Sequence, residues 1–127
     1  MLHKRTVCFL LLMVFVLSSA LSLADVLPFA STRFKTTSCY LPTSLNLSAS
    51  VSTYDDCDEL GVKSYALYKS NGTKVMSASP EDYEAGHKYS FSVDLSGYAS
   101  SGTSYYAVVT FYADGETRSQ TSGTVRF

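Results

Sequence analysis

The strongest constraint on the fold is an alternating stretch that ends in a turn dipeptide. Residues 105–113 read YYAVVTFYA and are followed by Asp114-Gly115. Side chains of an extended chain point alternately to opposite faces, so every second residue from Tyr105 to Phe111 shares one face, and that face is apolar enough for a core. Asp-Gly tolerates the positive φ that tight hairpin turns require. The stretch therefore predicts a half-buried strand that enters a hairpin.

The same pattern recurs along most of the chain. Asn71-Gly72 is a second hairpin dipeptide, and the sequence is rich in Ser, Thr, Val and Tyr but contains no Trp. The segment SPEDYEAGHK, with Pro80 and Gly86, is expected to cross from one sheet to another. We predict an all-β chain, a single antiparallel β-sandwich of about seven strands. The expected strands are Arg33 to Leu41, Ser44 to Thr53, Val62 to Lys69, Lys74 to Ser79, Lys88 to Leu95, Tyr105 to Ala113 and Thr117 to Phe127.

The N-terminus has the pattern of a secretory signal peptide. Lys4 and Arg5 precede an apolar run from Val7 to Leu17, which is short for a transmembrane helix and is followed by small residues up to Ala24. We expect residues 1–24 to be cleaved as a signal peptide helix and the protein to be secreted, with no membrane attachment afterwards. An uncleaved anchor is the alternative.

The predicted mature chain, residues 25–127, has the length of one domain. Without Lys4 and Arg5 it carries eight basic side chains against eleven acidic ones, a formal charge of −3. Its basic residues are scattered singly, whereas phosphate binding needs a clustered basic surface. Nucleic acid is therefore not an expected partner.

One part of the sequence resembles the end of a fibronectin type III or immunoglobulin-like domain. The matching residues are Leu95, Gly102, Thr103 and Tyr105, which precede the alternating strand. The resemblance implies that Tyr105 forms a tyrosine corner, with its hydroxyl bonded to backbone a few residues upstream. Leu95, Gly102 and Tyr105 are thus expected to be structural residues.

A second resemblance covers residues 57–127. CDELGVKSYALYKSNGTKV and AGHKYSFSVDLSGYASSGTSYYAVVTFYADGETRSQTSG are similar to a group of small secreted proteins of Gram-positive bacteria, in which a Cys-x-x-apolar-Gly segment precedes such strands. That group has no assigned activity. The resemblance implies secretion and an all-β sandwich, and it implies no mechanism.

The acidic stretch YDDCDELG, residues 54–61, is expected to be a solvated loop. A helix-flanked calcium loop needs Gly at its sixth position and an acid at its twelfth, but counting from Asp55 these positions are Leu60 and Ala66. An irregular calcium site remains the alternative for the acids. Its candidate ligands are Asp55, Asp56, Asp58 and Glu59.

The cysteines suggest a disulfide. After signal cleavage Cys39, Cys57 and His87 are the soft or imidazole ligands left, too few for a structural zinc site, so no cofactor is expected. A Cys39–Cys57 disulfide in an exported domain would stabilise it by roughly 3 kcal/mol. The predicted strands conflict with this pairing, because they place Cys39 near one turn and Cys57 near the far end of a strand. Either the strand boundaries differ or both cysteines stay reduced.

The sequence carries no catalytic constellation. His87 is the only histidine of the predicted mature chain, and no Ser has a Gly-x-Ser-x-Gly context. The acids Glu81, Asp82 and Glu84 lie so close together that a hydrated turn explains them better than a glycosidase pair. We expect a protein that is not an enzyme.

Aromatic surface is the remaining functional signal. Exposed tyrosines can stack on sugar rings or contact a protein surface, although cross-strand tyrosine pairs can also simply stabilise a sheet. Our first hypothesis is a secreted, monomeric binding module that contacts a cell-wall glycan or a surface protein through a sheet face. The rivals are a secreted antibacterial or inhibitory effector and a structural domain that assembles with its own copies. The tyrosines expected on the binding face are Tyr65, Tyr68, Tyr98, Tyr106 and Tyr112.

Overall fold

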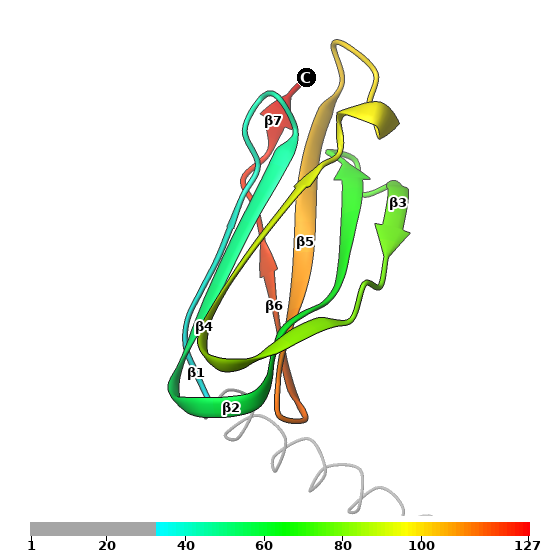
Figure 1. Cartoon of the computed structure of the whole chain (residues 1–127). Helices are drawn as coiled ribbons and strands as arrows, with labels where there is room; N and C mark the ends of the chain where they lie inside the picture. The colour runs from blue at the N-terminus through cyan, green and yellow to red at the C-terminus, as the bar shows by residue number, and fades with distance from the viewer. Residues whose placement is uncertain (1–32) are drawn as a thin grey trace, which may run out of the picture. The chain divides into compact units, whose positions relative to one another are not determined.

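The structure, a computed structural model, describes residues 33–127 as an all-β unit (Figure 1). The predicted signal peptide, residues 1–24, lies outside the described residues. None of residues 33–127 belongs to a helix that is long and apolar enough to cross a bilayer. The elements are β1 (Phe34–Tyr40), β2 (Asn46–Lys69), β3 (Lys74–Ala78), β4 (Asp82–Asp94), the short 3-10 helix η1 (Ser96–Tyr98), β5 (Ser104–Ala113), β6 (Glu116–Thr121) and β7 (Val125–Arg126).

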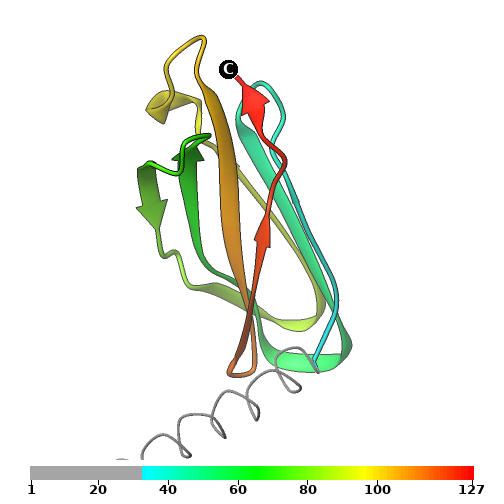
Figure 2. The ribbon, with the colours of Figure 1, turned by 180° about the vertical axis from the view of Figure 1, so that it is seen from behind.

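All seven strands belong to one antiparallel sheet, with β2 at its centre. The first part of β2 lies between β1 and β4, and its last part lies between β3 and β5. β6 and β7 pair with β5. β2 has 24 residues and bends sharply near its middle, as Figures 1 and 2 show. The bend coincides with register shifts between Ser52 and Leu60, because bulged residues increase the bend and twist of a strand.

The sheet curls until β1 and β6 face each other. Two hydrogen bonds join this region: the Thr37 hydroxyl donates to Gln120 Oε1 at 2.9 Å, and the backbone N–H of Arg33, the residue before β1, donates to Glu116 Oε2 at 3.2 Å. The predicted pair of separate sheets is therefore not what the structure has. It has a single curled sheet with the shape of a half-barrel, because β2 and β4 carry the pairing around the bend.

The concave side of the sheet holds the hydrophobic core. Inward-facing residues of every long strand contribute to it, and Tyr105 and Phe111 are the largest fully buried side chains. At roughly 25 cal/mol per Å² of apolar surface, this burial is the main stabilising contribution to the fold. The other large fully buried side chains are those of Leu41, Leu45, Leu47, Leu60, Leu67, Leu95, Val62 and Val109.

Two local predictions are confirmed. β5 alternates between buried and half-buried residues from Ser104 to Ala113, with Tyr105 and Phe111 inside. The Asp114-Gly115 dipeptide forms the hairpin between β5 and β6 with positive φ at both residues, 43° and 93°, and Asn71-Gly72 connects β2 to β3.

The predicted strand boundaries are wrong at three places. YDDCDELG is not a loop, because residues 54–61 belong to β2. The expected crossover loop is mostly the start of β4, which begins at Asp82. The last predicted strand is divided into β6 and β7, because the chain leaves the β5 edge after Thr121 and returns to it at Val125.

Candidate binding face

The convex side of β2, β5 and their neighbours carries two tyrosine pairs, and we call it the tyrosine face. Alternation in β5 turns Tyr106 and Tyr112 outward, opposite to the core residues. The partner strands contribute the residues that stand beside these two. The tyrosine face consists of Gly61, Ser64, Ala66, Tyr68, Lys74, Ser77, Tyr83, Tyr106, Val108, Thr110, Tyr112, Thr117, Ser119 and Thr121.

The first pair is formed by Tyr68 and Tyr106, which are direct cross-strand partners in β2 and β5. Their rings stack with centroids 5.3 Å apart and planes 11° apart. Lys74 Nζ lies 5.9 Å from the centroid of the Tyr68 ring, within the range of a cation–π contact. One end of the tyrosine face is therefore a broad aromatic surface with a positive charge beside it.

The second pair is formed by Tyr83 of β4 and Tyr112 of β5, with ring centroids 4.5 Å apart. Both residues are register partners of Gly61, which lies between them in β2. A Cβ at Gly61 would lie 1.9 Å from the carbonyl oxygen of Asp82, so β4 can pass here only over a glycine. Burial raises the pKa of Tyr83, and the negative charge of Glu81 adds to this effect.

A shallow hollow of about 260 Å³ lies on the tyrosine face near the first pair, and its lining includes Ser64, Tyr68, Lys74 and Thr110. Tyr106 and Tyr112 are six positions apart in β5, which corresponds to about 20 Å at the usual rise of a strand. The tyrosine face therefore offers aromatic surface at two ends and hydroxyl groups between them.

The structure brings together three of the five tyrosines proposed from the sequence: Tyr68, Tyr106 and Tyr112. Tyr65 faces the concave side instead, where its ring centroid lies 5.4 Å from that of Phe91. The pairing of β2 with β5 shifts between Val62 and Ser64. A strict alternation of faces counted along β2 therefore assigns the residues after this shift, including Tyr65, to the wrong side of the sheet.

Tyr98 lies in η1 rather than in the sheet, and 56% of its surface is exposed. Tyr83 belongs to the tyrosine face but is not among the predicted tyrosines, because the sequence predicts a crossover loop at this position. The neighbouring residues carry no signal for it, because the register of β4 with β2 shifts between Lys88 and Glu84, so Tyr83 lies on the opposite face from Tyr89 and Phe91.

The expected Cys39–Cys57 disulfide is wrong, since both thiols are free. β1 pairs Cys39 with Ala49, whereas Cys57 lies beyond the Thr53 end of that pairing, opposite Gly86 of β4. The register therefore holds the two cysteines much farther apart than the roughly 5 to 6 Å between bridged Cα atoms. Burial raises the pKa of the Cys39 thiol to about 11.

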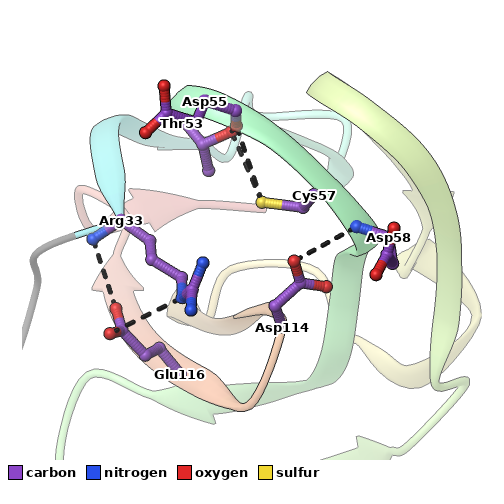
Figure 3. A network of polar contacts seen from close by, with 7 residues as sticks. All are labelled: Arg33, Thr53, Asp55, Cys57, Asp58, Asp114 and Glu116. Atoms are coloured by element: carbon purple, nitrogen blue, oxygen red, sulfur yellow. Dashed lines mark hydrogen bonds and ion pairs between the residues drawn. The ribbon is translucent and has the colours of Figure 1, made fainter.

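Cys57 lies in a polar network at the end of the half-barrel (Figure 3). It is 4% exposed, and its thiol lies 3.7 Å from both Thr53 Oγ1 and the Asp55 carbonyl oxygen. The ion pair between Arg33 and Glu116, with 3.7 Å from Nε to Oε1, lies nearby in the same view. The contacts of Cys57 lie within the bend of β2, and the ion pair joins the residue before β1 to the start of β6.

The backbone of the acidic stretch is held by a carboxylate from the turn between β5 and β6. The carboxylate of Asp114 accepts hydrogen bonds from the N–H groups of Asp58 and Glu59, at 3.1 and 2.8 Å. The Glu59 bond is the main reason why the pKa of Asp114 is lowered. Asp56 contacts His87 Nδ1 at 2.9 Å. Within residues 33–127, no three acids, histidines or cysteines are grouped to hold a metal, so the alternative calcium ligands are not brought together.

The three residues expected to be structural are held as follows. Tyr105 is 1% exposed, and its hydroxyl accepts a hydrogen bond from the Ser100 N–H at 2.8 Å. Ser100 lies five residues upstream, which is the contact of a tyrosine corner. Leu95 is fully buried, and Gly102 has a φ of 85° in the turn before β5.

Comparison with known proteins provides no family: no family model matches the chain, and no curated protein matches it. The geometry of the tyrosine face is therefore the basis for assigning a function.

Proposed function

We propose that this chain is a secreted, non-enzymatic binding module that holds an extracellular glycan, such as a cell-wall polysaccharide, on its tyrosine face. The main support for this proposal is the pair of stacked rings at each end of this face. Tyr68 stacks on Tyr106 at one end, and Tyr83 stacks on Tyr112 at the other. Secretion is proposed from the sequence, where Lys4 and Arg5 precede the apolar run.

The chemistry of the tyrosine face suits a sugar polymer. Tyrosine rings provide flat apolar area for the C–H faces of sugars, and their hydroxyls can hydrogen bond at the same time. Ser64, Thr110 and Ser119 provide further hydroxyls between the two pairs, of which Thr110 and Ser119 bond to each other at 2.9 Å. The residues that define the face include no carboxylate, which favours a neutral or anionic glycan over a cationic one.

The separation of the pairs bears on ligand length. A single sugar would contact one aromatic pair only, whereas a chain of several sugars would span the roughly 20 Å between Tyr106 and Tyr112. We therefore expect affinity to rise with oligosaccharide length until both pairs are engaged.

The fold supports a binding role by analogy only. We propose that the curled sheet is a variant of the immunoglobulin-like sandwich, on the strength of the Tyr105 to Ser100 corner and the hairpins around β5. Domains of this kind bind their ligands through loops or sheet faces. The fold class is therefore compatible with a binding face but does not specify its ligand.

The test is co-sedimentation of the purified protein with isolated cell walls and insoluble polysaccharides, with calcium and with EDTA. We expect Tyr106→Ala and Tyr112→Ala each to weaken retention about tenfold. Tyr40→Ala and Tyr54→Ala are matched controls, because these tyrosines are 65% and 68% exposed and lie elsewhere. Equal retention of all four variants would overturn the proposed face, and retention only with calcium would shift the site to the acids of β2.

A further inference from the structure

β4 has an open edge that the tyrosine face does not use. One side of β4 pairs with β2, and no strand of the described chain pairs with its other side. The regular part of this edge runs from Lys88 to Asp94, between the positive-φ Gly86 and η1. An unpaired strand edge presents backbone donors and acceptors that can bind another strand.

The register identifies which backbone groups point outward from this edge. The Leu95 N–H donates to the Leu45 carbonyl oxygen at 2.9 Å, and the pairing continues without a shift from Asp94 opposite Asn46 to Lys88 opposite Ser52. Hydrogen-bonded and non-hydrogen-bonded pairs alternate in an antiparallel sheet, so odd-numbered residues of this segment bond to β2. The even-numbered residues therefore direct their N–H and C=O groups to the open edge. They are Lys88, Ser90, Ser92 and Asp94.

We propose that a second copy of this chain pairs antiparallel with this edge, with the two-fold axis at Phe91. This register places Lys88 opposite Asp94 of the second copy and, by symmetry, Asp94 opposite Lys88 of the second copy. It also pairs even-numbered residues with even-numbered residues, so the outward backbone groups of both strands meet. Charge complementarity and hydrogen-bond geometry thus select the same arrangement.

The side chains on both faces suit this pairing. On the concave side, Phe91 would lie opposite its own copy and Tyr89 opposite Val93; Phe91 and Val93 are half-buried in the single chain. On the convex side, the small exposed Ser90 would lie opposite Ser92 of the second copy. No charged side chain stands in the middle of this edge to prevent such pairing, although edge strands are commonly protected in that way.

Both charged residues are available for the contact. Lys88 is exposed and forms no ion pair within residues 33–127. The Asp94 carboxylate is exposed, and its hydrogen bonds come from Ser96 alone, including one from the Ser96 N–H to Oδ1 at 3.0 Å, so no cation neutralises it within residues 33–127. Moving the register by two residues in either direction would place Lys88 opposite Ser92 or Ser96 and leave the charges of Lys88 and Asp94 unpaired. Among these registers, only the one centred on Phe91 pairs each lysine with an aspartate.

Cysteine cross-linking tests the register directly. Ser90→Cys and Ser92→Cys variants of the full chain are oxidised alone and as a mixture, beside the wild type, which controls for its own thiols. We expect a covalent dimer in the mixture, because residues 90 and 92 of the two copies are opposite each other. A mixture of Ser92→Cys with Ser119→Cys, an exposed residue of β6, is the control for collisions. A dimer from Ser90→Cys or Ser92→Cys alone, or an equal yield in the control, would overturn the proposal.

Charge exchange provides a second, independent measurement. Sedimentation velocity over a range of protein concentrations measures the dimer dissociation constant for Lys88→Glu and for the double variant Lys88→Glu, Asp94→Lys. We expect the single variant to raise the constant about tenfold, because two attractive pairs become repulsive, and the double variant to restore it. A wild type that stays monomeric at every concentration, or variants with the same constant as the wild type, would contradict the proposed pairing.

Discussion

The rings of Tyr83 and Tyr112 stack 4.5 Å apart across Gly61, although the two tyrosines lie on strands that do not pair with each other. Gly61 makes this possible because it lets the backbone of β4 approach β2 near Asp82, which brings Tyr83 opposite Gly61 and beside Tyr112. One glycine therefore shapes both the passage of β4 and one end of the tyrosine face.

The first prediction concerns Gly61→Ala. A Cβ at this position would lie 1.9 Å from the Asp82 carbonyl oxygen, and backbone atoms cannot yield as a flexible side chain can. We expect a loss of about 3 kcal/mol in the free energy of unfolding, measured by urea denaturation. Gly123→Ala is the matched control, because a Cβ added there would meet no atom within 4 Å. A stability equal to that of the control would show that β4 does not approach β2 as described.

The second prediction concerns Tyr105→Phe. The substitution keeps the buried ring but leaves the Ser100 N–H without its acceptor. We expect the free energy of unfolding to fall by about 1 to 2 kcal/mol, the usual cost of losing one partner of a part-buried hydrogen bond. Tyr98→Phe is the control, since Tyr98 is 56% exposed, and it should change stability very little. Two variants of equal stability would argue against a tyrosine corner.

The third prediction concerns acid stability. The carboxylate of Asp114 has a lowered pKa in the folded state, mainly because it accepts the Glu59 N–H. A lowered folded-state pKa means that this stabilisation is complete above the unfolded-state pKa of about 3.9 and is lost as the pH falls through the folded-state value. Asp114→Asn should therefore lower the melting temperature at pH 7 and make it less sensitive to acidification below about pH 4. If the melting temperature of the variant were lower by the same amount at every pH, the lowered pKa of Asp114 would not be the cause of the stabilisation.

The fourth prediction concerns the thiols. Cys57 is 4% exposed, and burial raises the pKa of Cys39 to about 11, so few thiolates are accessible in the folded protein. We expect iodoacetamide at pH 8 to label both cysteines roughly tenfold or more slowly in the folded protein than in denaturant. Labelling in denaturant should require no reductant. A requirement for reductant would instead indicate the disulfide that the register of β1 and β2 opposes.

Features that depend on neighbouring residues are predictable from the sequence. The hairpin at Asp114-Gly115 follows from two adjacent residues that accept positive φ. The division of β5 into a buried and an outward face follows from strict alternation between Tyr105 and Tyr112, where no bulge interrupts it. This alternation is sufficient to place Tyr106 and Tyr112 on the same face without any tertiary contact.

Features that depend on pairing between distant segments are not predictable in this way. The acids of residues 54–61 suggested a loop, but bulges allow β2 to continue through them and Asp114 holds their backbone. The shift between Val62 and Ser64 turned Tyr65 inward. Neither feature has a local signal, because a bulge is defined by the partner strand.

The sequence by itself determined that the described chain forms strands, where two of its hairpins turn and which side of β5 is buried, because propensity, turn chemistry and alternation act over a few residues. Only the tertiary structure decided that one curled sheet forms, that Cys39 and Cys57 stay apart, that Tyr83 meets Tyr112 over Gly61 and that one edge of β4 stays open. These outcomes depend on register, and register is set by contacts between residues that lie far apart in the chain.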